Sequence, residues 1–380
     1  MTEYKAPFPY FGGKSAVAEL VWSRLGADVP NYVEPFFGSG AMLLNRPGWA
    51  PETNCIETVN DLSGFISNFW RSVQADPDAV AHHADWIVSE SDLHARHGWL
   101  VRQAADLSAK MEGDPDYYDA RIAGWWVWGA CCWIGSGWCS GRGSWQQVEA
   151  PDGWRLVDMG ATEDGIQRAR PHLTGTGQGV NRQLVHLGNA GRGVNRKRVH
   201  LLHAGQGVNR SSVHAANGTN AGAGEQGIYA WMNALSARLR RVRVCCGDWS
   251  RICGPTPTVE NGVTGVFLDP PYAADTGRNM NLYEIDLKHK KNRKLGVGER
   301  VYEWCRQNED NPMLRIALCG YEGEYDLPGW ECVAWKAHGG YGSQGDSRGR
   351  ENADRERIWF SPRCLRPTAR IQAGLFDGME

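Results

Sequence analysis

Short apolar runs alternate with longer amphipathic stretches along this chain. The runs Tyr32-Val33, Val266–Leu268 and Leu314–Leu318 are each followed by polar or turn-forming residues, a pattern typical of buried strands. Residues 66–123 carry apolar positions at helical spacing, and residues 301–307 are predicted to form a further helix. Strands that alternate with helices predict an α/β fold with an open sheet.

The carboxyl-terminal part adds two more predicted strands, Trp330–Lys336 and Arg357–Phe360, which we expect to form an antiparallel pair. Residues 366–380 are predicted to be a loose tail. Residues 124–143, in the middle of the chain, are rich in glycine and tryptophan. We expect these tryptophans to lie mainly in the core, and the glycine-rich loop that contains Arg142 to contact a ligand or a base.

A basic repeat follows this aromatic segment. Gly-Val-Asn-Arg begins at Gly179 and recurs at Gly193 and Gly207, a period of 14 residues. No Asp or Glu occurs between Gly165 and Gly224, and such a segment favours phosphate groups. Two structures stay open for it: a small ribbon that enters a groove, or a flexible insert that grew by duplication. The DNA contacts predicted here are Arg182, Arg196, Lys197, Arg198 and Arg210.

The segment Asp269-Pro270-Pro271-Tyr272 directly follows a predicted strand. Ligands bind at the carboxyl ends of strands in open α/β sheets. An exocyclic amine of a base is a poor nucleophile, and two acceptors directed at its N–H bonds would activate it. Asp269 and the carbonyl of Pro270, whose ring restrains the backbone, supply two such acceptors, and Tyr272 offers a ring for stacking on a flipped base. The plainer alternative is a proline-rich turn that Asp269 merely stabilises.

Two further segments lie near the amino end. The first is Pro9-Tyr10-Phe11-Gly12-Gly13-Lys14, and the second, Glu34-Pro35-Phe36-Phe37-Gly38-Ser39-Gly40, leads from a strand into a helix start. Glycines at such a turn allow a ligand to approach the backbone closely. Asp61 follows Gly40 by 21 residues, the usual distance of an acid that binds ribose hydroxyls. The turn lacks the full G-x-G-x-x-G pattern, so NAD is not favoured.

The order of these segments resembles that of the Dam-like, D12 class of DNA adenine-N6 methyltransferases. The resemblance covers residues 7–75 and 240–275 and extends weakly to the carboxyl end. It implies S-adenosylmethionine (S-adenosyl-L-methionine) as the methyl donor and a Rossmann-like sheet. The catalytic residues that it implies are Asp269, Pro270, Pro271 and Tyr272. The cofactor-binding residues that it implies are Tyr10, Phe11, Lys14, Glu34, Pro35, Phe36, Gly38, Gly40, Asp61, Asp248 and Trp249.

Within this set, Asp61 is expected to bind the cofactor ribose, and Asp248 to accept a hydrogen bond from the cofactor adenine, with Trp249 packed nearby. The expected catalytic domain is discontinuous, comprising residues 1–75 and 236–365. Residues 76–235 are the expected insert, mainly helical and rich in Gly and Arg, which recognises the DNA target. The three Gly-Val-Asn-Arg repeats occupy about residues 177–218 of this insert. Lys290, Lys291 and Arg293 follow the catalytic segment and are predicted either to face solvent or to form a flap on the DNA.

Composition narrows the remaining possibilities. No run of 18 apolar residues occurs, and the amino end lacks a basic stretch followed by an apolar core, so neither a membrane span nor secretion is expected. The 11 cysteines form no C-x-x-C pair, which favours reduced thiols in the cytoplasm over a zinc site. No Pro-Cys pair occurs, and this argues against methylation of cytosine C5 through a cysteine nucleophile.

The expected function is site-specific methylation of adenine N6 in double-stranded DNA, by base flipping and direct transfer. Methylation of cytosine N4 or of an RNA base is the alternative, and a non-catalytic DNA-binding relative is a more distant one. The protein is expected to be a monomer or a weak dimer of bacterial or phage restriction-modification type. The recognition sequence and the existence of a cognate restriction nuclease stay open.

Overall fold

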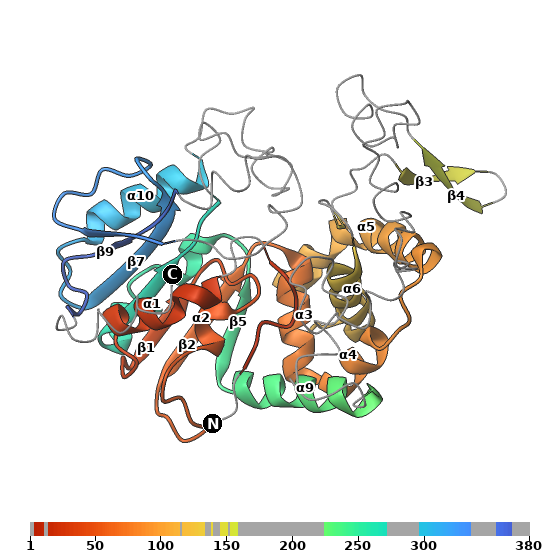
Figure 1. Ribbon diagram of the computed structural model, residues 1–380, viewed down its shortest axis with the longest axis horizontal. Coiled ribbons are helices and arrows are strands. Elements are labelled where there is room, and N and C mark those ends of the chain that lie inside the picture. Colours follow the sequence, from red (N-terminus) through yellow and green to blue (C-terminus); the bar gives the residue numbers. More distant parts are fainter. Residues whose placement is uncertain are drawn as a thin grey trace, which may run out of the picture.

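A computed structural model of the chain describes residues 4–10, 14–114, 116–133, 138–139, 145–150, 153–158, 224–271, 296–335 and 355–366. Its centre is a mixed seven-stranded sheet with helices around it, an α/β architecture consistent with a methyltransferase (Figure 1). The strand order is β5-β2-β1-β6-β7-β9-β8. The bounds are β1 Asn31–Glu34, β2 Ile56–Asp61, β5 Val242–Cys246, β6 Thr264–Leu268, β7 Leu314–Tyr321, β8 Glu331–Ala334 and β9 Glu356–Phe360.

Five of these strands are parallel, and two are not. β5, β2, β1, β6 and β7 run parallel, whereas β9 is antiparallel to both β7 and β8. The predicted antiparallel pair of carboxyl-terminal strands is therefore confirmed. Strand β2, the next strand in the chain after β1, pairs with β1 on one side, and β6 pairs with β1 on the other side. The carboxyl ends of β1 and β6 thus lie at a topological switch point, the usual ligand position in such sheets.

The two faces of the sheet pack into separate cores. Phe267 of β6 joins the larger core, to which helix α1 (Ala18–Leu25) and helix α3 (Gly64–Ala75) contribute. Its neighbours Val266 and Leu268 join the other core with Val301 of helix α10 (Val297–Asn308). Successive side chains of a strand point to opposite faces, so a strand between two cores is apolar throughout. This is why the sequence 266–268 reads as one continuous apolar run.

The remaining helices gather beside edge strand β5 (Figure 1). They are α4 (Pro77–Ala84), α5 (Glu90–Gly113), α6 (Ala120–Cys132) and α9 (Gly224–Leu239). A hairpin of β3 (Trp145–Ala150) and β4 (Gly153–Asp158) forms a sheet of its own, which the sequence analysis missed. Shorter elements are α2 (Ala41–Leu44) and the 3-10 turns η1 (Lys14–Val17), η3 (Trp249–Ile252) and η4 (Val259–Asn261).

Helix α6 continues nine residues beyond 123, the predicted end of the helical region, into the segment that is rich in glycine and tryptophan. The glycines have a packing role inside this helix. A Cβ atom on Gly124 would collide with His83 of α4, and one on Gly129 would collide with the ring of Trp138. Trp126 and Trp128 are buried, as predicted for the tryptophans of this segment.

Helix α9 attaches the helical group to the sheet. Gln74 of α3 donates to the carbonyl of Leu239 at the end of α9 and to that of Val242 at the start of β5, and Ser236 of α9 donates back to the carbonyl of Gln74. The boundary suggested at residues 235 and 236 therefore falls inside one continuous helix.

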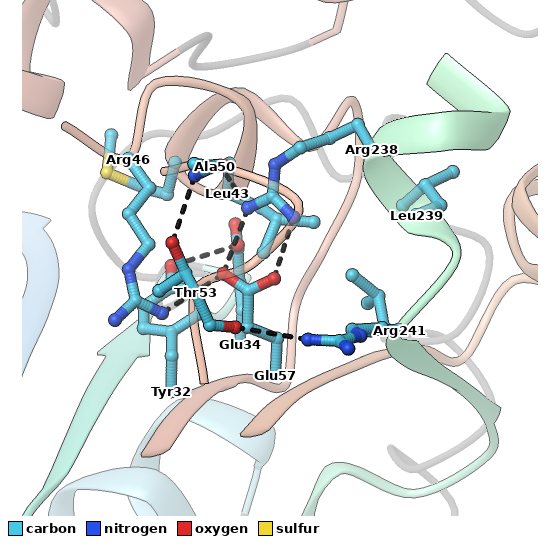
Figure 2. A network of polar contacts seen from close by, with 12 residues as sticks. Tyr32, Glu34, Leu43, Arg46, Ala50, Thr53, Glu57, Arg238, Leu239 and Arg241 are labelled. Atoms are coloured by element: carbon cyan, nitrogen blue, oxygen red, sulfur yellow. Dashed lines mark hydrogen bonds and ion pairs between the residues drawn. The ribbon is translucent and has the colours of Figure 1, made fainter. Parts of the chain in front are cut away.

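A buried ion cluster also holds α9 to β2 (Figure 2). The Glu57 carboxylate accepts from Arg46 at 3.0 Å and from both terminal nitrogens of Arg238 at 2.7 and 2.9 Å. The Arg238 guanidinium also lies 4.4 Å from the ring centroid of Trp49. Both arginines and Glu57 are buried, so each charge depends on its partners.

Candidate functional site

A cavity opens at the carboxyl ends of β1, β2, β5 and β6, where the sequence analysis places the chemistry. It encloses about 930 Å³ of space, a volume that includes some open solvent. Eleven of the predicted site residues line it: Tyr10, Lys14, Glu34, Pro35, Phe36, Gly38, Asp61, Asp248, Trp249, Asp269 and Pro271. Pro270 and Gly40 lie in the same turns but are not among the lining residues.

The turn after β1 requires its glycines. Gly38 and Gly40 have φ angles of +49° and +72°, a backbone conformation that side chains disfavour. The ring of Tyr10 lies directly against Gly38, and a Cβ atom there would be 2.5 Å from the ring. The missing side chain thus makes room for the aromatic segment that precedes η1, and Tyr10 forms part of the cavity wall.

Asp61 ends β2 at the cavity rim. Its carboxylate accepts from the backbone N–H of Gly38 at 3.0 Å and of Ser63 at 2.8 Å. Removal from solvent raises the pKa of Asp61 to about 6, although these backbone hydrogen bonds act in the opposite direction. A carboxylate can accept further hydrogen bonds beyond these two, so Asp61 remains able to bind a hydroxyl group.

Lys14 and Asp269 form an ion pair inside the cavity. Lys14 Nζ lies 2.9 Å from Asp269 Oδ2, and the side chain of Lys14 is 5% exposed against 21% for Asp269. Burial by itself would lower the pKa of Lys14, but the charge of Asp269, and that of Glu356 behind it, raises the pKa above its ordinary value. Lys14 therefore carries its charge at neutral pH and places it beside the predicted catalytic carboxylate.

Glu34 lies deeper, at the end of β1. Tyr32 donates its hydroxyl proton to Glu34 Oε2 at 2.9 Å, and both side chains are buried. Burial raises the pKa of Glu34 well above its ordinary value, and the charge of Asp269 adds to this effect. Glu34 thus retains a proton more readily than an exposed carboxyl, and it supports the floor of the cavity.

Nine of the lining residues had no predicted role, and Asn60, Val297 and Arg300 are among them. Asn60 donates to the carbonyl of Pro35 at 3.1 Å and to that of Gly247 at 3.0 Å, so it joins the turns that follow β1 and β5. Val297 and Arg300 come from the first turns of α10. Asn60 directly precedes Asp61 in the sequence and could have been found, whereas nothing local in the sequence marks Arg300.

The other predicted site residues lie outside the described residues. They are Phe11, Tyr272, Arg142, Arg182, Arg196, Lys197, Arg198, Arg210, Lys290, Lys291 and Arg293. Within the described part of the chain, no helix is both long and apolar enough to cross a membrane. Among the same residues, no group of three or more His, Cys, Asp or Glu side chains is arranged to hold a metal ion.

Comparisons with known proteins bear on the amino-terminal half of this site. Residues 10–101 match the family model of the D12 class N6 adenine-specific DNA methyltransferase. No curated protein matches the chain. The matched range includes η1, the glycine turn after β1 and Asp61, so it covers most of the residues that line the cavity from the amino-terminal side. Residues 10–101 are therefore similar to the D12 class N6 adenine-specific DNA methyltransferases, the family that the motifs of the chain resemble.

Proposed function

We propose that this protein transfers a methyl group from S-adenosylmethionine to N6 of adenine at a short site in double-stranded DNA. The observation that carries the proposal is the Lys14–Asp269 ion pair inside a cavity that the glycine turn and Asp61 also line. The family match at residues 10–101 does not depend on this geometry and supports the same reaction.

The cavity suits the proposed cofactor. Phe36 and Trp249, whose ring centroids lie 6.2 Å apart, offer an apolar wall for an adenine base. Asp61 offers an acceptor for ribose hydroxyls, and the turn around Gly38 brings backbone close to the ligand. When bound, S-adenosylmethionine supplies a methyl group on a sulfonium, which is a strong electrophile and needs no covalent intermediate.

The chain then has to activate and orient the target amine. Asp269 is paired with Lys14 and is the first proposed acceptor, for one N–H of the amine, and the carbonyl of Pro270 is the second proposed acceptor. Two acceptors withdraw the nitrogen lone pair from the ring and direct it toward the methyl group. The nitrogen would gain the methyl group as the bond between that group and the sulfonium sulfur breaks, which leaves a neutral thioether, and the nitrogen would release its proton to water. Tyr272 is the proposed stacking partner of the base, which leaves the duplex to reach the site.

DNA recognition is assigned to the inserted region. We propose that residues 76–235 form the target-recognition part of the protein, with residues 1–75 and 236–365 as the catalytic part. Arg182, Arg196 and Arg210 occupy the same place in the three repeats and are the proposed DNA contacts, together with Lys197, Arg198 and Arg142. Lys290, Lys291 and Arg293 are proposed to contact the DNA beside the catalytic turn. The protein is proposed to be a monomer or a weak dimer in the cytoplasm.

Transfer of a tritiated methyl group to nucleic acid tests this proposal. The protein is incubated with tritiated S-adenosylmethionine and with duplex DNA, single-stranded DNA or RNA in parallel. We expect label in duplex DNA, and loss of about 10²–10³ in the single-turnover rate of Asp269→Ala. Asp326→Ala is the matched control, because Asp326 is exposed and does not line the cavity. Label in RNA alone, or no label in any nucleic acid, would contradict the proposal.

A further inference from the structure

The carboxylate of Asp248 has a fixed orientation at the cavity rim. Asp248 follows β5, and its Oδ1 accepts from the backbone N–H of Ser250 at 3.0 Å and from the hydroxyl of Ser250 at 2.6 Å. These contacts cap η3 and bind one carboxylate oxygen. The other oxygen, Oδ2, accepts from Arg300 Nη2 at 2.9 Å. Both oxygens thus have partners that define the plane of the carboxylate, and Oδ2, with one partner, keeps a further acceptor position.

Arg300 reaches Asp248 from a distant part of the chain. It lies in the second turn of α10, 52 positions after Asp248, and its guanidinium lies 5.9 Å from the ring centroid of Trp249. The start of α10 also borders the catalytic turn, since a Cβ atom on Gly298 would lie 3.5 Å from the carbonyl oxygen of Pro271. The Arg300–Asp248 contact therefore connects the end of β5 to the helix beside the catalytic turn, across one side of the cavity.

We propose that Arg300 is a positioning residue that holds Asp248 in the orientation needed to recognise the adenine base of the cofactor. This inference rests on the proposed function. An ionised carboxylate can only accept hydrogen bonds, so it pairs with the 6-amino group of adenine and opposes the 6-oxo group of hypoxanthine. A site that accepts a hydrogen bond from its ligand discriminates against a ligand that lacks the donor group, because the acceptor in the site is then left without a partner.

The charge on Asp248 supports this role. Partial burial by itself would raise the pKa of Asp248, but the hydrogen bonds from Arg300 and Ser250 outweigh it and lower the pKa below its ordinary value. Asp248 is therefore ionised at neutral pH, which is the state that discriminates between an amino and an oxo group. Loss of Arg300 would remove one hydrogen bond and allow the carboxylate to rotate.

Equilibrium binding measurements distinguish the positioning role of Arg300 from other effects of this residue on the cofactor site. Calorimetry is used to measure the affinity for S-adenosylhomocysteine and for S-inosylhomocysteine, whose bases differ in the group at position 6 and in the proton that hypoxanthine carries at N1. The wild type should bind the adenosyl ligand about 10-fold or more tightly than the inosyl ligand, because one charge-assisted hydrogen bond contributes about this much to affinity. Arg300→Ala should lower adenosyl affinity and reduce this preference at least three-fold, and Arg300→Lys, which keeps the charge, should retain part of it. Arg306→Ala is the matched control on the exposed side of the same helix.

A double-mutant cycle completes the test. In the Asp248→Ala background, the preference should be absent, and Arg300→Ala should have no further effect on it. Equal loss of affinity for both ligands in Arg300→Ala would mean that Arg300 acts elsewhere on the cofactor and would overturn the positioning role, as would unchanged binding. Thermal unfolding of each variant identifies any variant that has lost its fold. If Arg300→Ala has lost its fold, the ligand preference of Arg300→Lys decides the test. Failure of the wild type to bind either ligand would instead refute the proposed function.

Discussion

Lys14 Nζ and Asp269 Oδ2 lie 2.9 Å apart, although their residues are separated by most of the chain. Lys14 begins η1 near the amino end, and Asp269 follows β6 at the centre of the sheet. The contact joins the two segments that the sequence analysis considered separately, one as a cofactor contact and the other as the catalytic turn. It gives the proposed acceptor of the target amine a permanent counter-charge in a largely buried position.

Lys14→Met should lower the single-turnover rate of methyl transfer by about 10²–10³, because Asp269 then loses the ion-pair partner that holds its carboxylate in place. Lys14→Arg, which keeps the charge, should retain more activity. Rapid-quench measurement at saturating cofactor gives the rate directly. A normal rate in a folded Lys14→Met protein would remove the ion pair from the mechanism, and circular dichroism establishes that the variant is folded.

Cofactor affinity should fall as the pH falls through about 6. Burial raises the pKa of Asp61 to about 6, so the carboxylate is ionised above this pH and protonated below it. The ionised form is the stronger acceptor for a ribose hydroxyl, so affinity should be highest above pH 6. Calorimetric titration with S-adenosylmethionine from pH 5 to pH 8 measures the effect. Asp61→Asn should bind weakly at every pH and show no such step; a step that persists in it would belong to another group.

Glu57→Gln should destabilise the fold by about 3–5 kcal/mol, because it leaves Arg46 and Arg238 buried without a counter-charge. Denaturant unfolding monitored by tryptophan fluorescence measures the change. Glu112→Gln is the control, since its contact with Arg251 is 4.0 Å long and solvent-exposed, and it should change the stability by less than about 1 kcal/mol. Equal effects of the two substitutions would refute the structural role of the cluster shown in Figure 2.

Simultaneous replacement of Arg182, Arg196 and Arg210 by Ala should weaken DNA binding and flatten its salt dependence. If each arginine meets a phosphate, the log–log salt slope falls by about 0.9 per lost contact on duplex DNA. If each reads a guanine edge, the loss is selective for the cognate site, at about 1–3 kcal/mol per contact. Cofactor affinity should not change. Unchanged DNA affinity and salt slope would mean that the repeats are a passive insert.

The sequence was most informative where chemistry and local structure coincide. Asp269 follows a continuous apolar run, and such a run between two cores is a buried strand, so its position at the sheet end was predictable. Gly38 was identified as part of a glycine-rich turn, and the structure shows that its positive φ angle and its contact with Tyr10 both require glycine. These local signals were sufficient to predict most of the cavity.

Contacts between distant segments could not be read from the sequence. Arg300 lies in an ordinary amphipathic helix, and only the folded chain brings it to Asp248. Helix α6 was cut short in the prediction because Gly124 and Gly129 disfavour helix in isolation. Their cost is offset by the close approach of His83 and Trp138, which local propensity does not report.

The identity of the methylated nucleoside tests the central claim most directly. Duplex DNA is labelled with tritiated S-adenosylmethionine and the wild-type protein, digested to nucleosides and separated by chromatography with mass detection. The account predicts that the label is found in N6-methyl-2′-deoxyadenosine, and that the Asp269→Ala protein yields about 10²–10³ less of it within the same single turnover. Label in N4-methyl-2′-deoxycytidine, or in 5-methyl-2′-deoxycytidine, would contradict the account.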